Sequence, residues 1–126
     1  LDFGLAKVVG DATVTASRGI RLSLAYAPPE RYQGEPQTPQ SDLYQAGLVL
    51  FEMATGRRAF ADDDPSRLAT AHLMKPPPSA HALAPDLPRL IDRVFERCLQ
   101  KKPRERYASA EALSEDWEYL LAAPPA

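Results

Sequence analysis

Several residue types in this chain could do chemistry, but most of them have a simpler structural reading. The run Asp62–Asp64 could hold a metal, yet Pro65 follows it directly, and an aspartate before a proline marks the start of a helix. We therefore expect the acidic run to cap and solvate a helix. A lone Cys98 can build neither a zinc site nor an internal disulfide, and it fits a small core residue in a reducing cytosol. His72 and His81 have no partner at catalytic spacing and are expected on a helix face and in a loop.

The first 29 residues hold the remaining candidates for chemistry. A glycine-bearing turn, Asp2-Phe3-Gly4, precedes a hydroxyl-rich run of low hydrophobicity over 10–19. The tripeptide by itself is more often an ordinary turn than a site. A loop of this length without structure of its own is uncommon in a compact domain and is usually functional or mobile. We expect the segment 1–29 to be functional.

Composition places the chain among soluble globular domains. Its 126 residues are 44% hydrophobic and 25% charged, which fits one domain. Fifteen Lys and Arg against 17 Asp and Glu leave a net charge of −2, which gives no electrostatic case for nucleic acid or an anionic membrane surface. No hydrophobic run reaches the ~20 residues of a membrane span, and no signal sequence opens the chain. The missing initial methionine and the Ala/Pro-rich end over 122–126 suggest a piece of a longer protein.

The elements that must position these residues are organised around one helix, predicted over Ser41–Gly56. We expect Ser41 to be its N-cap and Gly56 to end it. Pro36 and Pro39 should keep the helical turn before it short. Only a narrow polar stripe, at Gln45 and Glu52, should face away from neighbours. The residues expected to be buried are Leu43, Tyr44, Ala46, Leu48, Val49, Leu50, Phe51, Met53 and Ala54.

Three more helices are predicted, and a short helical turn is expected within 30–40. One helix begins at Pro65 with Asp64 as its N-cap, and an irregular connection should follow it as far as Pro85. A second helix lies within 88–100, and a third, capped by Ser109, runs over 109–123. Because no strand is predicted with certainty, the fold class is mainly α. The inward-facing residues of the last two helices are expected to be Leu90, Ile91, Val94, Phe95, Cys98, Leu99, Leu113, Trp117, Leu120 and Leu121.

Four short motifs, taken in order, carry a resemblance to a known family. They are Asp2-Phe3-Gly4, Tyr26-Ala27-Pro28-Pro29-Glu30, Ser41-Asp42-x-Tyr44-x-x-Gly47 and Cys98-Leu-x-x-x-Pro103-x-x-Arg106. In sequence and spacing they resemble the DFG, APE, central-helix and terminal-arginine motifs of protein kinases. The chain is similar to the second half of the large helical lobe of a eukaryotic-like Ser/Thr kinase, and most similar to the bacterial enzymes. This implies an incomplete, mainly helical C-terminal lobe around one buried central helix.

The resemblance also implies a domain division and a set of ATP-site residues. Residues 1–122 would be a partial kinase domain, with 1–30 as the activation segment, 31–122 as the helical subdomain and 123–126 as the start of a Pro/Ala-rich linker. Asp2 would be the metal ligand, chelating the Mg²⁺ that bridges the ATP phosphates. Phe3 would pack beneath this site, and Gly4 would give the backbone freedom that lets Asp2 face in or out.

Four hydroxyl residues of the activation segment have implied roles. Ser23 lies where the family has a catalytic-site threonine that contacts the catalytic Asp and Lys, although Leu22 stands where glycine is usual. Thr13, Thr15 and Ser17 are candidate phosphorylation sites, since a phosphate adds nearly two charges that can order a loop against arginines. The simpler alternative for each of the three is a solvated hydroxyl.

Three charged residues have implied structural roles. Glu30 and Arg106 are predicted to form a buried ion pair that fastens the end of the activation segment to the last helices. Asp42 is expected to accept hydrogen bonds from backbone amides of the catalytic loop; the alternative is a simple interaction with the helix dipole. The small departures from the family pattern are Pro28, Lys102 and Tyr107.

The implied function is transfer of the γ-phosphate of Mg·ATP to a Ser or Thr hydroxyl of a protein substrate, by a cytoplasmic parent that could be membrane-anchored. The 126 residues lack the Gly-rich loop, the strand lysine and its glutamate, and the H-R-D-x-x-x-x-N catalytic loop. These parts of the N-lobe and catalytic loop are expected upstream of Leu1, so the isolated chain should be inactive. The alternatives are a pseudokinase or scaffold module with the same fold and a helical protein of other ancestry. The upstream sequence would distinguish them.

Overall fold

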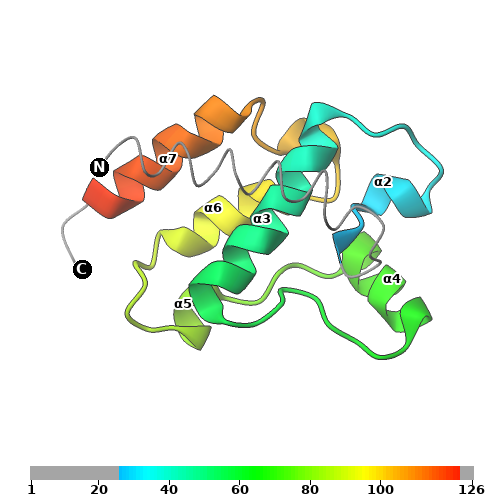
Figure 1. Ribbon diagram of the computed structural model, residues 1–126, viewed down its shortest axis with the longest axis horizontal. Coiled ribbons are helices and arrows are strands. Elements are labelled where there is room, and N and C mark those ends of the chain that lie inside the picture. The colour runs from blue at the N-terminus through cyan, green and yellow to red at the C-terminus, as the bar shows by residue number, and fades with distance from the viewer. Residues whose placement is uncertain (1–25, 123–126) are drawn as a thin grey trace.

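The computed structural model describes residues 26–122, which form an assembly of helices without a strand in that range (Figure 1). The mainly α prediction is therefore confirmed for the described residues. The helices are α2 (Pro29–Tyr32), α3 (Pro39–Thr55), α4 (Pro65–Met74), α5 (Ala80–Leu83), α6 (Ile91–Cys98), the 3₁₀ helix η3 (Pro103–Glu105) and α7 (Ala110–Ala122). No helix among the described residues combines the length and hydrophobicity needed to cross a membrane.

The long helix α3 is the predicted central helix, but it begins earlier than the sequence analysis expected. Its N-cap is Thr38, whose side chain accepts a hydrogen bond from the backbone N–H of Ser41. Ser41 returns the bond by accepting from the N–H of Thr38 at 3.0 Å, which completes a capping box. The prediction of Ser41 as N-cap was wrong because Pro39 occupies the first helical turn, where a missing N–H costs nothing. At the other end Gly56 has φ 76°, a left-handed conformation that stops the helix as predicted.

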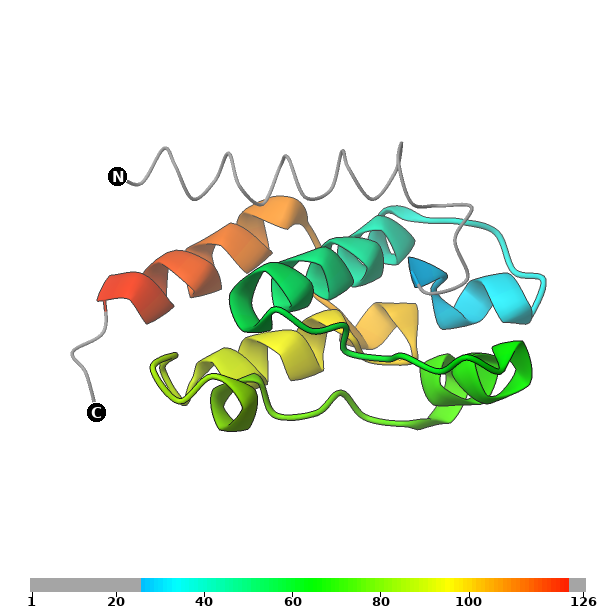
Figure 2. The same cartoon turned by 60° about the horizontal axis from the view of Figure 1, so that its bottom comes forward.

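Helix α3 runs through the middle of the described part, with α6 beside it and α7 packed against α6 (Figures 1 and 2). Phe51 of α3 meets Phe95 of α6 edge to face at 5.1 Å between ring centroids. Phe95 in turn meets Trp117 of α7 at 5.9 Å, also edge to face. Since aromatic pairs in this geometry gain about 0.5–1.5 kcal/mol beyond their buried area, the three rings join three helices into one core.

The closest approach in this core is between the backbone of Gly47 and α6. A Cβ added at Gly47 would lie 2.7 Å from the Cβ of Cys98 and 3.2 Å from a methyl of Leu99. Glycine at this position therefore sets how near the two helices come. Cys98 is fully buried, as predicted, and burial raises the pKa of its thiol to about 12, so it stays protonated and unreactive.

Four burial predictions were wrong, and each concerns a face that local sequence cannot define. Met53, Leu90 and Leu121 were expected inside but are 66%, 40% and 67% exposed. Gln45 was expected on the polar stripe but is fully buried. The reason is that helical periodicity gives the spacing of a face, while the neighbouring helices decide which face is covered.

One helix was missed. The connection after α4 was expected to be irregular, but it contains α5, one turn long. The side chain of Ser79 accepts from the backbone N–H of Ala82, and the carboxylate of Asp92 in α6 accepts from the N–H of His81 and from the Ser79 hydroxyl. A carboxylate from a distant segment thus stabilises a turn too short to be stable alone.

We predict that Gly47→Ala destabilises the chain by about 1–3 kcal/mol, because the added methyl overpacks the contact with Cys98. Urea unfolding of the wild type and the variant measures this. Met53→Ala, at an exposed position of the same helix, is the control and should lie within about 0.5 kcal/mol of the wild type. Equal or greater stability of Gly47→Ala, as helix propensity alone would give, would show that the close approach is not a constraint.

Candidate functional site

The centre of the candidate site is a buried ion pair between residues far apart in the sequence. Arg106 and Glu30 are only 3% and 2% exposed. The two terminal nitrogens of Arg106 donate to the two carboxylate oxygens of Glu30, at 2.7 Å and 2.9 Å. This is the two-pronged geometry in which guanidinium and carboxylate bind most strongly. The predicted ion pair is present, and it joins α2 to the segment just after η3.

The remaining donors of Arg106 are satisfied by backbone carbonyls. Its Nε donates to the oxygen of Gln100 at 2.7 Å, and its terminal nitrogens also reach the oxygens of Gln40 at 3.0 Å and Lys101 at 3.2 Å. The guanidinium carbon lies 4.8 Å from the ring centroid of Tyr44. One arginine therefore fixes the first turn of α2, the start of α3 and the loop after α6 to one another.

Glu30 is held in its charged form by hydrogen bonds that outweigh its burial. Burial by itself would raise the pKa of Glu30, but the bonds from Arg106 and from the Ser41 hydroxyl, at 2.6 Å, bring that pKa below its ordinary value of 4.5. Ser41 thus has two roles, as third residue of the capping box and as a donor to the buried carboxylate.

Asp42 lies in the first turn of α3 and is half-buried. Its carboxylate accepts from the side-chain amide of Gln37 at 3.1 Å, and the same amide donates to Gln45 at 3.2 Å. The amide nitrogen of Gln45 is buried without a hydrogen-bond partner in the described part of the chain. The expected contact of Asp42 with a catalytic loop stays a prediction.

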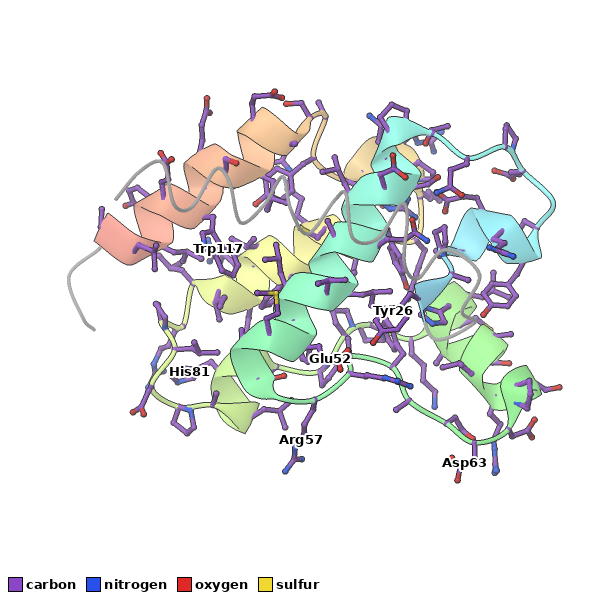
Figure 3. All side chains as sticks on the ribbon, viewed as in Figure 1. Tyr26, Glu52, Arg57, Asp63, His81 and Trp117 are labelled. Atoms are coloured by element: carbon purple, nitrogen blue, oxygen red, sulfur yellow. The ribbon has the colours of Figure 1, made fainter. Side chains whose placement is uncertain are left out.

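Sequence reasoning missed a contact between Tyr26, just before α2, and the far end of α3. The hydroxyl of Tyr26 donates to Glu52 Oε1 at 2.6 Å, and both residues are labelled in Figure 3. The guanidinium of Arg58 lies 5.5 Å from the Tyr26 ring centroid. Burial, and then the bond to Glu52, raise the pKa of the Tyr26 phenol, so it remains a donor. In the sequence, only the predicted place of Glu52 on the polar stripe pointed to a partner for this carboxylate. Nothing in the sequence identified Tyr26 as that partner.

His72 lies in α4, on a helix as expected, and is fully buried. Its Nδ1 lies 2.9 Å from the Tyr44 hydroxyl, and its ring meets that of Phe60 edge to face at 5.0 Å. The expectation of a loop for His81 was wrong, because His81 lies in α5. Its Nδ1 lies within 2.6 Å of the Leu87 oxygen. Both histidines have structural partners.

The other predicted site residues lie outside the described residues. These are Asp2, Phe3, Gly4, Thr13, Thr15, Ser17 and Ser23. Within residues 26–122 no group of three or more His, Cys, Asp and Glu side chains is placed to hold a metal ion. This agrees with reading the acidic run before α4 as a cap, since Asp64 accepts from the N–H of Ser66 at 2.9 Å.

We predict that removing only one partner of the ion pair lowers the unfolding free energy by much more than that partner contributes in the intact pair. Glu30→Gln and Arg106→Met should each destabilise the chain by about 3–5 kcal/mol, because each leaves the other charge buried and unpaired. The double variant should lose much less than the sum of the two. A double-mutant cycle by urea unfolding measures this coupling, and strictly additive losses would contradict it.

We also predict a pH window for this stabilisation. Because the pKa of Glu30 is lower in the folded chain than its ordinary 4.5, the contribution is present above that value and is lost as pH falls through the folded pKa. The difference in unfolding free energy between the wild type and Glu30→Gln should therefore shrink below about pH 4.5. A difference that stays constant from pH 7 to pH 3 would show that the carboxylate pKa is not lowered by folding.

Comparison with known proteins places this geometry in a family. The model of the protein kinase domain matches residues 1–118. The chain is 36% identical over 118 residues to the probable serine/threonine-protein kinase PknB of Bifidobacterium longum, covering 92% of the chain and 17% of that protein. It is 34% identical over 115 residues to PrkC of Bacillus subtilis, with 91% and 18% covered, and 39% identical over 108 residues to PknA of Mycobacterium tuberculosis, with 86% and 24% covered.

The chain thus spans about a fifth of the length of these relatives. The match takes in most of the chain, including both partners of the buried ion pair. On this evidence the chain belongs to the protein kinase family, as part of a kinase domain.

Proposed function

We propose that the protein containing this chain is a serine/threonine protein kinase that transfers the γ-phosphate of ATP to Ser or Thr hydroxyls of protein substrates. Family membership supports this, and the names of the similar bacterial proteins point to Ser/Thr as the acceptors. The structural observation that carries it is the buried pair of Glu30 and Arg106, which fixes the last residues of the proposed activation segment to the helical body.

In the proposed reaction the acceptor hydroxyl oxygen bonds to the γ-phosphorus while the bond from that phosphorus to the β,γ-bridging oxygen breaks, and ADP leaves. Asp2 would hold Mg²⁺, which when bound neutralises charge on the phosphates. Phe3 and Gly4 would support and orient Asp2. The hydroxyl of Ser23 would position the catalytic aspartate, which would take the acceptor proton and is supplied by a part of the protein outside these 126 residues.

Within the domain, we assign residues 1–30 to the activation segment, 31–122 to the helical subdomain and 123–126 to the start of a linker. The pair of Glu30 with Arg106 would anchor the segment, and Asp42 would bind the catalytic loop through its amides. Thr13, Thr15 and Ser17 would accept regulatory phosphates. The protein would act in the cytoplasm, on protein substrates, whether or not a membrane anchor lies elsewhere in it.

The test is transfer of labelled γ-phosphate from ATP to a protein substrate by the full-length protein. We predict Mg²⁺-dependent transfer that Asp2→Asn reduces by about a hundredfold or more, because the metal loses its carboxylate ligand. Asp63→Asn, which changes an exposed aspartate of the acidic run before α4, is the matched control and should retain activity. The isolated 126-residue chain should show no turnover.

A full-length protein that binds ATP but transfers no phosphate would favour the pseudokinase alternative and overturn the proposal. Mass spectrometry of the active protein tests the regulatory sites in the same reaction. Phosphate on at least one of Thr13, Thr15 and Ser17 is expected, and its absence from all three would remove that assignment.

A further inference from the structure

A pocket of about 620 Å³ lies between α2, α4 and the segment 101–104. Both ribbon views place α2 and α4 at the same end of the described part (Figures 1 and 2). Pro29, next to Glu30, forms part of the wall, and Gln33 at the end of α2 adds a side-chain amide. The pocket is of the size that holds organic ligands, roughly 300–1,000 Å³, and is larger than one small ion requires.

The lining of the pocket is positively charged although the chain as a whole is not. Lys101, Lys102 and Arg104 line it, against one carboxylate, that of Glu35. The pocket thus carries an excess of two positive charges in a chain of net charge −2. Lys102 and Arg104 are exposed, and neither forms an ion pair within residues 26–122. Their charges are available to a ligand.

Lys101 also forms no ion pair within residues 26–122. Its ammonium donates to the oxygen of Ala71 at 3.2 Å and lies 4.4 Å from the ring centroid of Phe60, so these contacts are with a carbonyl and a ring and not with a carboxylate. Burial, and then the nearby charge of Arg106, lower the pKa of Lys101 to about 8. An anion in the adjacent pocket would supply the missing opposite charge.

We propose that this pocket, which we call the α2–η3 pocket, binds a phosphorylated Ser or Thr side chain of a partner protein. A phosphate monoester carries about −1.5 to −2 charges at neutral pH, which matches the excess of two positive charges, whereas a carboxylate carries half of that. Arg104 offers the planar fork suited to phosphate oxygens, and the two lysines act as point charges. The volume beyond the phosphate leaves room for the residue that bears it.

The inference rests on the proposed function only for the origin of the phosphate, since a Ser/Thr kinase makes such side chains. It adds that phosphorylated proteins bind at a pocket whose lining includes none of the proposed ATP-site residues. The α2–η3 pocket itself is built wholly from described residues.

The test is fluorescence anisotropy of the full-length protein with a labelled phosphothreonine peptide and its unphosphorylated twin. We expect the phosphopeptide alone to bind. Lys102→Gln with Arg104→Gln should weaken its binding by about tenfold or more, because two charge-assisted contacts are lost. Glu35→Gln should tighten binding severalfold, since it removes the opposing carboxylate. Arg57→Gln with Arg89→Gln, two exposed arginines that do not line the pocket, is the charge-matched control and should bind like the wild type.

Equal binding of the two peptides, or equal losses in the pocket variant and the charge-matched control, would overturn the inference. So would inorganic phosphate that binds as tightly as the phosphopeptide, since the ligand would then be the free ion. Phosphate transfer to an unphosphorylated peptide should be the same in the wild type and the pocket variant. In the wild-type protein, absent transfer with phosphopeptide binding intact would count against the proposed function alone. Absent phosphopeptide binding with transfer intact would count against the pocket alone.

Discussion

The described structure depends on one buried charge pair, and on the fact that a buried charge must be fully satisfied. Glu30 and Arg106 are separated by 76 residues, yet both lie out of contact with water. The cost of removing them from water is repaid only if their geometry is good and the remaining donors find acceptors. The carbonyls of Gln40, Gln100 and Lys101 meet that condition, so α2, the start of α3 and the loop after α6 must all come to the same place. The pair therefore selects one arrangement of the chain more than it adds net stability.

The central helix makes that convergence possible. Because residue 47 is a glycine, α3 and the end of α6 at Cys98 and Leu99 approach closely. Arg106, a few residues further along the chain, then reaches the Gln40 oxygen at the start of α3. The capping box fixes the start of α3, and its third residue, Ser41, also donates to Glu30. Helix packing, helix capping and the ion pair are thus linked through a few side chains at one end of α3.

The segment after α6 contributes to two different features of the molecule. The carbonyls of Gln100 and Lys101 face inward to Arg106, while the side chains of Lys101 and Lys102 line the α2–η3 pocket. Any ligand in that pocket would therefore lie beside the backbone that holds the end of the proposed activation segment.

The sequence by itself determined the features that depend on neighbours along the chain. Periodicity and caps predicted the four longer helices, with Asp64 before α4 and Gly56 after α3 in their predicted places. The contact between residues 30 and 106 was predicted as well, but only because the ordered motifs resemble those of protein kinases. Nothing local to either residue indicates its partner.

The tertiary structure alone decided which helix faces are covered and which distant groups meet. It buried Gln45, exposed Met53, paired Tyr26 with Glu52 and made a stable turn at α5 by means of Asp92. A helix pattern repeats every 3.6 residues in any surroundings, so it cannot say where a neighbour will lie. Side-chain partners across the fold follow from packing, which only the folded chain defines.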